Sequence, residues 1–308
     1  MKKKILILGG SSLVSVNIAY FFNKTYDLFL ACNSKKPLIK NINSFFISFK
    51  KKNLILLLKK INPDIIIISS ANTNIENCEK YKKKTRSTNY ELVKIVVDLS
   101  KIFKFKTIFF STDQVYRGNQ HNSKENSNLL PLNYYAKTKI LSEKYIMKNI
   151  KNFLILRTNF FGYGPKYRQS FSDTILIDYE KKISKKYFID NKFSSIYMPY
   201  LAKILNQLIK KNCSGIFNLC SSNSLSKYEF AYNLIKKFKP SVKYIKKDYL
   251  RLNTNLVKRP LDMSMSNKKI LKKINIRIPT IKNQISLMKK DYNSKYYRFM
   301  KKLRISHK

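Results

Sequence analysis

The sequence predicts an α/β protein built on a doubly wound parallel sheet. Short, continuously apolar runs, such as ILIL at 5–8 and the isoleucines of DIIIISS at 64–70, are typical of strands buried on both faces. Segments with helical periodicity separate these runs, and such alternation indicates a parallel sheet covered by helices. The first strand ends at Gly9-Gly10 and a helix is expected directly after it, at the junction where such folds bind phosphate groups.

The first half of the chain supplies the regular part of this pattern. Strands are expected at 5–8, 26–31, 64–70, 106–111 and 153–158. Helices are expected between them, at 13–22, 54–61, 89–103 and 135–148. Pro63-Asp64 separates the second helix from the third strand, because proline cannot continue a helix. Connections between successive parallel strands should be right-handed crossovers.

Past Thr158 the alternation becomes less regular. Helices are expected at 197–211 and 227–238, and GIFNLC at 215–220 is expected to be a strand. The basic, tyrosine-rich tail from Lys289 is expected to form a frayed helix. The chain has only six glycines, all at expected element ends or loops, which indicates positions that need positive φ or a close backbone approach.

The composition limits the classes of partner. Lys and Arg number 63 against 17 Asp and Glu, a formal net charge of +46 that invites a nucleic-acid interpretation. Only nine of these basic residues are Arg, the side chain best suited to bidentate phosphate and base contacts, and the lysines are spread along the whole chain. We therefore expect no dedicated nucleic-acid binding, although the charge should attract anionic ligands.

Cysteines and apolar runs indicate the compartment. None of the four cysteines forms a C-x-x-C pair and only two histidines are present, so no metal site is expected. The apolar run at 5–8 is too short for a signal peptide, and no stretch is long enough to span a membrane. We expect a cytoplasmic protein with reduced thiols.

Two segments suggest a dinucleotide site. GGSSLVS, at 9–15, follows the first strand, but it carries Gly9, Ser12 and Ser15 where one large family of such folds has three glycines. The same residues would also suit an ordinary turn between a strand and a helix, with a serine as the helix cap and no bound cofactor. After the second strand, ACNSKKP carries Ser34 and Lys35 instead of an acidic residue, which favours the extra phosphate of NADP over NAD.

A third segment, PLNYYAKTK at 131–139, suggests proton transfer. Tyr135 and Lys139 are four residues apart and share one helix face, whereas Tyr134 does not. A nearby ammonium group favours a phenolate and lowers the tyrosine pKa, so such a tyrosine can exchange a proton with a carbinol oxygen. The same spacing also arises by chance in a chain rich in both residue types.

Taken in order, several segments resemble the extended short-chain dehydrogenase/reductase superfamily, and within it the dTDP-4-dehydrorhamnose reductase family of sugar-nucleotide enzymes. FFSTDQVYRG at 109–118 is similar to the family's S-T-D-x-V-F/Y-x-G segment. The likeness covers roughly residues 3 to 288 and also rests on NPDIIIISSANTNIENCE, PLNYYAKTK, ILRTNFFGYG, SSIYMPYLA, SKYEFA and RPLDMSMSNKKI. The serines at 12 and 15 depart from the family's glycine loop and leave cofactor affinity most in question.

The resemblance implies a role for each matching residue. Tyr135 would be the general acid, Lys139 would hold the nicotinamide ribose, and Thr112 would hydrogen-bond the substrate carbonyl. The implied cofactor-binding residues, besides Tyr135 and Lys139, are Gly9, Ser12, Leu13, Val14, Ser34, Lys35, Ala71, Asn72, Thr73 and Asn89. The implied substrate-binding residues are Thr112, Asp113, Gln114, Phe160 and Arg259.

The resemblance implies a Rossmann-type domain at 1–160 and a mainly substrate-binding domain at 161–308, with one segment returning to the sheet. The implied activity is NADPH-preferring reduction, with NADH possible, of the 4-keto group of a nucleotide-linked 6-deoxyhexose. A homodimer is also possible. Two alternatives stay open: a sugar-nucleotide epimerase or dehydratase on the same fold, and a non-catalytic regulatory subunit. Asp113-Gln114 is not the Asp-Glu pair expected of a dehydratase.

Overall fold

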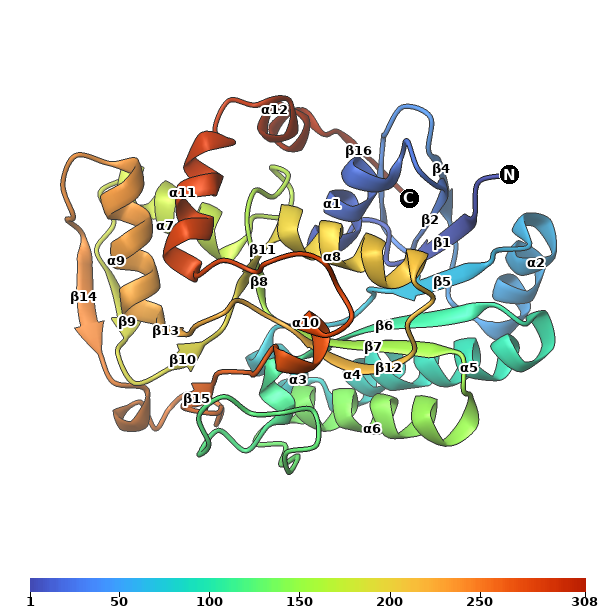
Figure 1. The fold of residues 1–308 in the computed structure, drawn as a ribbon, viewed down its shortest axis with the longest axis horizontal. Helices are drawn as coiled ribbons and strands as arrows, with labels where there is room; N and C mark the ends of the chain where they lie inside the picture. The colour runs from blue at the N-terminus through green and yellow to red at the C-terminus, as the bar shows by residue number, and fades with distance from the viewer.

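A seven-stranded parallel sheet forms the centre of the computed structural model, which describes all 308 residues (Figure 1). The strand order is β12-β7-β6-β5-β1-β2-β4. The strands are β1 (Lys4–Leu8), β2 (Asp27–Cys32), β4 (Asn43–Phe46), β5 (Ile65–Ile68), β6 (Lys106–Thr112), β7 (Phe153–Thr158) and β12 (Gly215–Leu219). The predicted doubly wound α/β class is confirmed.

Alternate side chains of the central strands enter two separate cores, as period-2 strands buried on both faces require. Ile5, Ile7 and their counterparts on neighbouring strands pack with helices α1 (Leu13–Phe22) and α8 (Met198–Lys210) on one face. Leu6, Leu8 and their counterparts pack on the other face with α2 (Lys51–Ile61), α5 (Leu92–Phe103) and α6 (Tyr134–Asn149). The apolar runs of the strands thus explain both helical layers.

A smaller lobe lies beside the carboxyl ends of the strands (Figure 1). Its helices are α7 (Phe171–Glu180), α9 (Lys227–Phe238) and α11 (Ile281–Lys290), which share one aromatic-rich core. Its short strands are β8 (Phe160–Phe161), β9 (Lys185–Phe188), β10 (Lys192–Phe193), β11 (Ile196–Tyr197), β13 (Leu225–Ser226), β14 (Ile245–Asp248) and β15 (Asp262–Met263). The remaining short helices are α3 (Ile75–Lys80), α4 (Lys82–Arg86) and α10 (Lys268–Leu271).

The C-terminal tail packs against α1, a helix that covers one face of the central sheet. Helix α12 (Lys295–Lys302) packs on α1, where Tyr296 donates a hydrogen bond to Asn17 (2.5 Å) and the Phe299 ring lies 4.9 Å from that of Tyr20. The strand β16 (Ile305–His307) then pairs antiparallel with β3 (Lys35–Pro37), far away in sequence. A helix in the tail was predicted from the sequence but this strand was not, because pairing over such a separation leaves no local signal.

The helix expected at 89–103 differs at its start. A π-helical turn, Ser87–Glu91, precedes α5 and places Asn89 in the interior of the protein. Such wide turns occur often at functional sites, and this one directs a side chain that a regular helix would place elsewhere.

Candidate active site

A cavity of about 260 Å³ lies at the carboxyl ends of β5, β6 and β7, the edge of the sheet at which such folds bind ligands. It brings together nine of the residues named from the sequence: Val14, Ala71, Thr73, Thr112, Asp113, Gln114, Tyr135, Lys139 and Phe160. Ser69, Phe110, Ser111, Thr158 and Asn159 complete its lining. Segments that are far apart in sequence therefore meet in one pocket.

The Tyr135–Lys139 pair is fixed by the start of α6. Asn133 caps this helix by accepting a hydrogen bond from the Ala136 N–H (2.9 Å), and its side-chain amide donates to the Lys258 carbonyl (3.0 Å). The cap therefore ties the helix start to the second half of the chain. Tyr135 and Lys139 lie one turn apart on the cavity side, and both are buried.

The lowered tyrosine pKa that the spacing predicted is not what the structure shows. Burial raises the pKa of Tyr135 above its ordinary value, and a hydrogen bond with Thr112 only partly opposes this rise. The Lys139 ammonium instead donates to the Phe110 carbonyl (2.5 Å) and lies 4.1 Å from the centroid of the Phe109 ring. Burial lowers the pKa of Lys139 to about 7. The phenol is thus held in its protonated form.

Polar groups at the end of β6 form the opposite wall. The Thr112 hydroxyl accepts the Gln114 N–H (3.3 Å) and donates to an Asp113 oxygen (3.1 Å). The other Asp113 oxygen accepts a hydrogen bond from Asn159 (2.9 Å). Burial raises the pKa of Asp113, while the charge of Lys227 and these hydrogen bonds act in the opposite direction.

The loop between β1 and α1 fits a pyrophosphate group. Gly9 has φ of +92°, and a Cβ there would lie 2.6 Å from the Ser70 nitrogen, so only glycine is accommodated. Ser12 caps α1 by accepting the Ser15 N–H (3.2 Å), which leaves the first two helical amides, those of Leu13 and Val14, without intrahelical acceptors. A helix start with free amides is an anion site.

Ser15 takes a position where the family has glycine, and its hydroxyl has a structural use. It donates to the Gly9 carbonyl (3.0 Å) and lies 2.6 Å from the Ser69 hydroxyl at the end of β5. Ser69 in turn donates to the Leu8 carbonyl (2.9 Å). These hydroxyl groups hold the loop between β1 and α1, which is the proposed phosphate-binding loop, against the neighbouring strand.

Asn89 supports the loop at 71–73 from behind. Its side-chain oxygen accepts the Asn72 N–H (2.8 Å), and its amide donates to the Asn72 carbonyl (3.0 Å) and to Thr138 (3.2 Å). Asn72 and Asn89 therefore do not line the cavity themselves. They fix the backbone of Ala71 and Thr73, which do.

Three predicted residues lie apart from the cavity. Ser34 and Lys35 lie at the turn between β2 and β3. Arg259 forms an ion pair with Glu76 and donates through Nε to the Val257 carbonyl (3.2 Å). Its guanidinium group is therefore paired with Glu76 and does not line the cavity.

Several residues of the site were not predicted from the sequence. Asn159 and Ser69 directly follow buried strands, so their position at the carboxyl edge was a readable signal. Glu143 and Arg157 form a buried ion pair below the cavity, with Nη2 of Arg157 2.6 Å from Oε2 of Glu143. Ser111 donates to Glu143, which connects this pair to β6.

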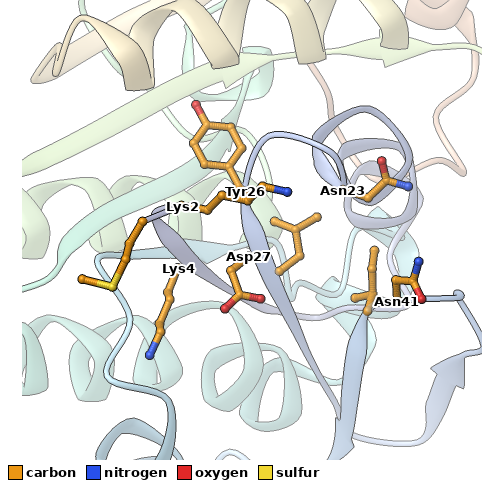
Figure 2. Close-up of a pocket in the computed structure, with 9 residues that line it drawn as sticks. Lys2, Lys4, Asn23, Tyr26, Asp27 and Asn41 are labelled. Atoms are coloured by element: carbon orange, nitrogen blue, oxygen red, sulfur yellow. The ribbon is translucent and has the colours of Figure 1, made fainter.

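A second cavity, of about 480 Å³, opens at the opposite end of the sheet (Figure 2). Lys2, Lys4, Tyr26 and Asp27 are among its lining residues, at the amino ends of β1 and β2. Ligands of doubly wound sheets bind at the carboxyl ends of the strands, so this hollow is not the candidate site. No helix of the structure combines the length and the apolar character needed to cross a membrane.

Comparisons with known proteins agree with this geometry. The chain is 29% identical over 177 residues to the spore coat polysaccharide biosynthesis protein SpsK of Bacillus subtilis, which covers 57% of this chain and 61% of that protein. It is 26% identical over 183 residues to the dTDP-4-dehydrorhamnose reductase of Escherichia coli, covering 56% and 59%. These matches thus span about three-fifths of the curated relatives.

A solved structure is similar over nearly the whole chain. The dTDP-4-dehydrorhamnose reductase of Bacillus anthracis, determined in complex with NADP, superposes with a TM-score of 0.83 at 19% identity. The superposition covers 94% of this chain and 100% of that one, which shows that the fold is shared. The sequence model of the RmlD substrate binding domain matches residues 2–294. The resemblance read from the sequence is therefore confirmed, and the chain belongs to the RmlD family, whose matched relatives include dTDP-4-dehydrorhamnose reductases.

Proposed function

We propose that this protein is an NAD(P)-dependent oxidoreductase that reduces the 4-keto group of a nucleotide-linked 6-deoxyhexose, with a preference for NADPH. The observation that carries the proposal is the meeting of Thr112, Tyr135 and Lys139 in one cavity beside the phosphate-binding loop. We further propose that residues 1–160 bind the cofactor and that 161–308 mainly bind the substrate. The substrate we favour is the dTDP-linked 4-keto precursor of rhamnose.

NADPH, when bound, would supply the hydride that reaches C4 of the sugar. Tyr135 would then protonate the oxygen at C4. A general acid must carry its proton at working pH, and the raised pKa of the buried Tyr135 phenol supports that role. The Thr112 hydroxyl, which interacts with the same phenol, would orient the substrate oxygen.

Lys139 would act on the cofactor side of the cavity. Its only hydrogen bond is to the Phe110 carbonyl, so two of the three ammonium protons are free for the hydroxyl groups of a ribose. Because burial lowers the pKa of Lys139 to about 7, a bound ribose that accepts from the ammonium form would raise its charged fraction.

The sugar would lie between Phe160 and the β6 end. Asp113 and Gln114 offer hydrogen-bonding groups for sugar hydroxyls, and the Phe160 ring offers an apolar surface for a ring face. Arg259 would need to leave Glu76 in order to reach a substrate diphosphate. Binding energy from the nucleotide would serve to position the sugar for reduction.

Two other functions remain as rivals on this fold. A dehydratase would need a further acid/base pair, and the cavity has Gln114 beside Asp113 where a second carboxylate would be expected. A non-catalytic regulatory subunit would not need cofactor turnover. The serines of the phosphate-binding loop are compatible with that role, but Ser12 leaves the first amides of α1 free for an anion.

The test is a titration of the purified protein with NADPH and NADH, followed through nicotinamide fluorescence. Saturable binding that favours NADPH, followed by NADPH oxidation when a 4-keto sugar nucleotide is added, is the expected result. Folded protein that binds neither cofactor would refute the reductase proposal and favour the regulatory subunit. Conversion of the sugar nucleotide without net NADPH oxidation would instead favour an epimerase or dehydratase.

A further inference from the structure

The C-terminal tail is a feature of this chain that the family match does not include. The match ends at residue 294, and residues 295–308 form α12 and the strand β16. The tail is anchored at several points. The Tyr296 hydroxyl is hydrogen-bonded to Asn17 of α1 (2.5 Å), and Lys301 forms an ion pair with Asp173 (2.7 Å). The tail thus packs against both α1 and the smaller lobe, since Asp173 belongs to α7.

Beyond this anchor the chain pairs with the segment that follows β2. Residues Ile305, Ser306 and His307 lie opposite Pro37, Lys36 and Lys35, in that order. The Lys308 N–H donates to the Ser34 carbonyl (3.2 Å), which extends the pairing to the β2–β3 turn. In a dinucleotide-binding fold, the end of the second strand is where the adenosine ribose and any 2′-phosphate lie.

The paired segments concentrate positive charge. Residues 33–40 contain three lysines, residues 304–308 contain Arg304, His307 and Lys308, and neither segment has an Asp or Glu. None of the lysines or arginines among them takes part in an ion pair. Across the paired strands Lys35 lies opposite His307, and Lys36 lies opposite Ser306. Because no carboxylate of either segment offsets the lysine and arginine charges, a bound anion would stabilise this arrangement.

The charged segments are connected to the phosphate-binding loop. A Cβ on Gly10 would lie 2.8 Å from the Cys32 sulfur, so the end of β2 lies directly below the loop. Burial raises the pKa of the Cys32 thiol to about 11, and the Lys36 charge is one of the interactions that oppose the rise. Lys36 is therefore within electrostatic reach of the base of the loop.

We propose that β16 completes the binding site for the adenosine 2′-phosphate of NADPH, with the basic residues of the tail acting together with Ser34, Lys35 and Lys36. This inference rests on the proposed cofactor. It makes the last five residues of the chain, Arg304 to Lys308, determinants of the preference for NADPH over NADH.

The experiment measures this subsite with a ligand that has no nicotinamide. Adenosine 2′,5′-bisphosphate and 5′-AMP are titrated by calorimetry into the full chain, a chain that ends at Leu303, and the full-length double variant R304Q/K308Q. A second double variant, K295Q/K302Q, removes the same number of charges from exposed positions of α12 and serves as the matched control. Thermal unfolding verifies that each variant is folded.

We expect the full chain and the α12 control to prefer the bisphosphate by about tenfold or more, the size of one or two charge-assisted hydrogen bonds. Loss of β16 should remove most of that preference, R304Q/K308Q should reduce it, and 5′-AMP affinity should change little. Equal preference in all four proteins, or no preference in the full chain, would overturn the inference. A tail-dependent preference without any NADPH oxidation would leave the inference standing and refute the proposed reductase activity.

Discussion

The side chains of Glu143 and Arg157 form an ion pair that is completely enclosed by the protein, directly below the cavity that holds Lys139. Glu143 lies one helical turn after Lys139 on α6, and Arg157 belongs to β7. Arg157 also donates to the Tyr116 hydroxyl and to the Glu125 carbonyl (both 2.9 Å). The pair thus joins α6, the sheet and the loop after β6.

Glu143→Gln should be strongly destabilising, because it leaves the Arg157 guanidinium buried without its counter-charge. We expect a loss of about 3–5 kcal/mol in the free energy of unfolding, measured by urea denaturation. Glu180→Gln removes the partner of Lys239 in an exposed ion pair and should cost less than about 1 kcal/mol. Equal effects of the two substitutions would show that the buried pair contributes no more than a surface pair.

Asn89→Ala should weaken cofactor binding, although the Asn89 side chain does not line the cavity. The substitution removes both hydrogen bonds to the Asn72 backbone and frees the loop at 71–73, at a cost of about 1–3 kcal/mol in stability. Asn89→Asp keeps the acceptor but buries a carboxylate oxygen against the Asn72 carbonyl, so it should lower NADPH affinity at least as much. If the affinity in Asn89→Ala equals that of the wild type, the positioning role is wrong.

Lys139 should make stability increase with pH. Its pKa is about 7 in the folded protein and 10.5 in the reference state, so the unfolded chain binds more protons between these values. From pH 7 to pH 9 this group should add about 2 kcal/mol to the free energy of unfolding. The increase should be smaller by about this amount in Lys139→Met and unchanged in Lys137→Met, whose lysine is exposed. A part of the increase should persist in Lys139→Met, because burial also lowers the pKa of Lys227 to about 8. An equal increase in Lys139→Met and wild type would contradict the prediction.

Much of the fold was readable from the sequence because strand and helix signals are local. The apolar runs at 5–8 and 153–158 predicted buried strands, and the helical pattern of residues 13–22 after Gly10 predicted α1. The strands β3 and β4 were missed, since they are short and half-exposed and lack a continuous apolar run. The strand β16 was missed because only its partner, more than two hundred residues away, makes it a strand.

The residues of the candidate site likewise include some that the sequence identified and others whose surroundings only the structure revealed. Thr112 and Tyr135 were identified because each lies in a compact motif, and the structure brings them to one cavity. The state of Tyr135 was predicted with the wrong sign, because spacing on a helix indicates a neighbouring lysine but not the burial that raises the phenol pKa. The partner that holds Arg259, Glu76, also required the three-dimensional structure.

The proposed reductase activity can be tested by single-turnover oxidation of protein-bound NADPH, measured after the dTDP-linked 4-keto-6-deoxyhexose is added to wild type and to Tyr135→Phe. The phenylalanine ring keeps the shape of the site, so cofactor affinity should be retained while the rate falls by a factor of about 10²–10⁴, the usual contribution of a general acid. Tyr134→Phe, in which the tyrosine faces away from the cavity, should react at the wild-type rate. Equal rates in Tyr135→Phe and wild type, or no oxidation by wild type that binds NADPH, would contradict this account.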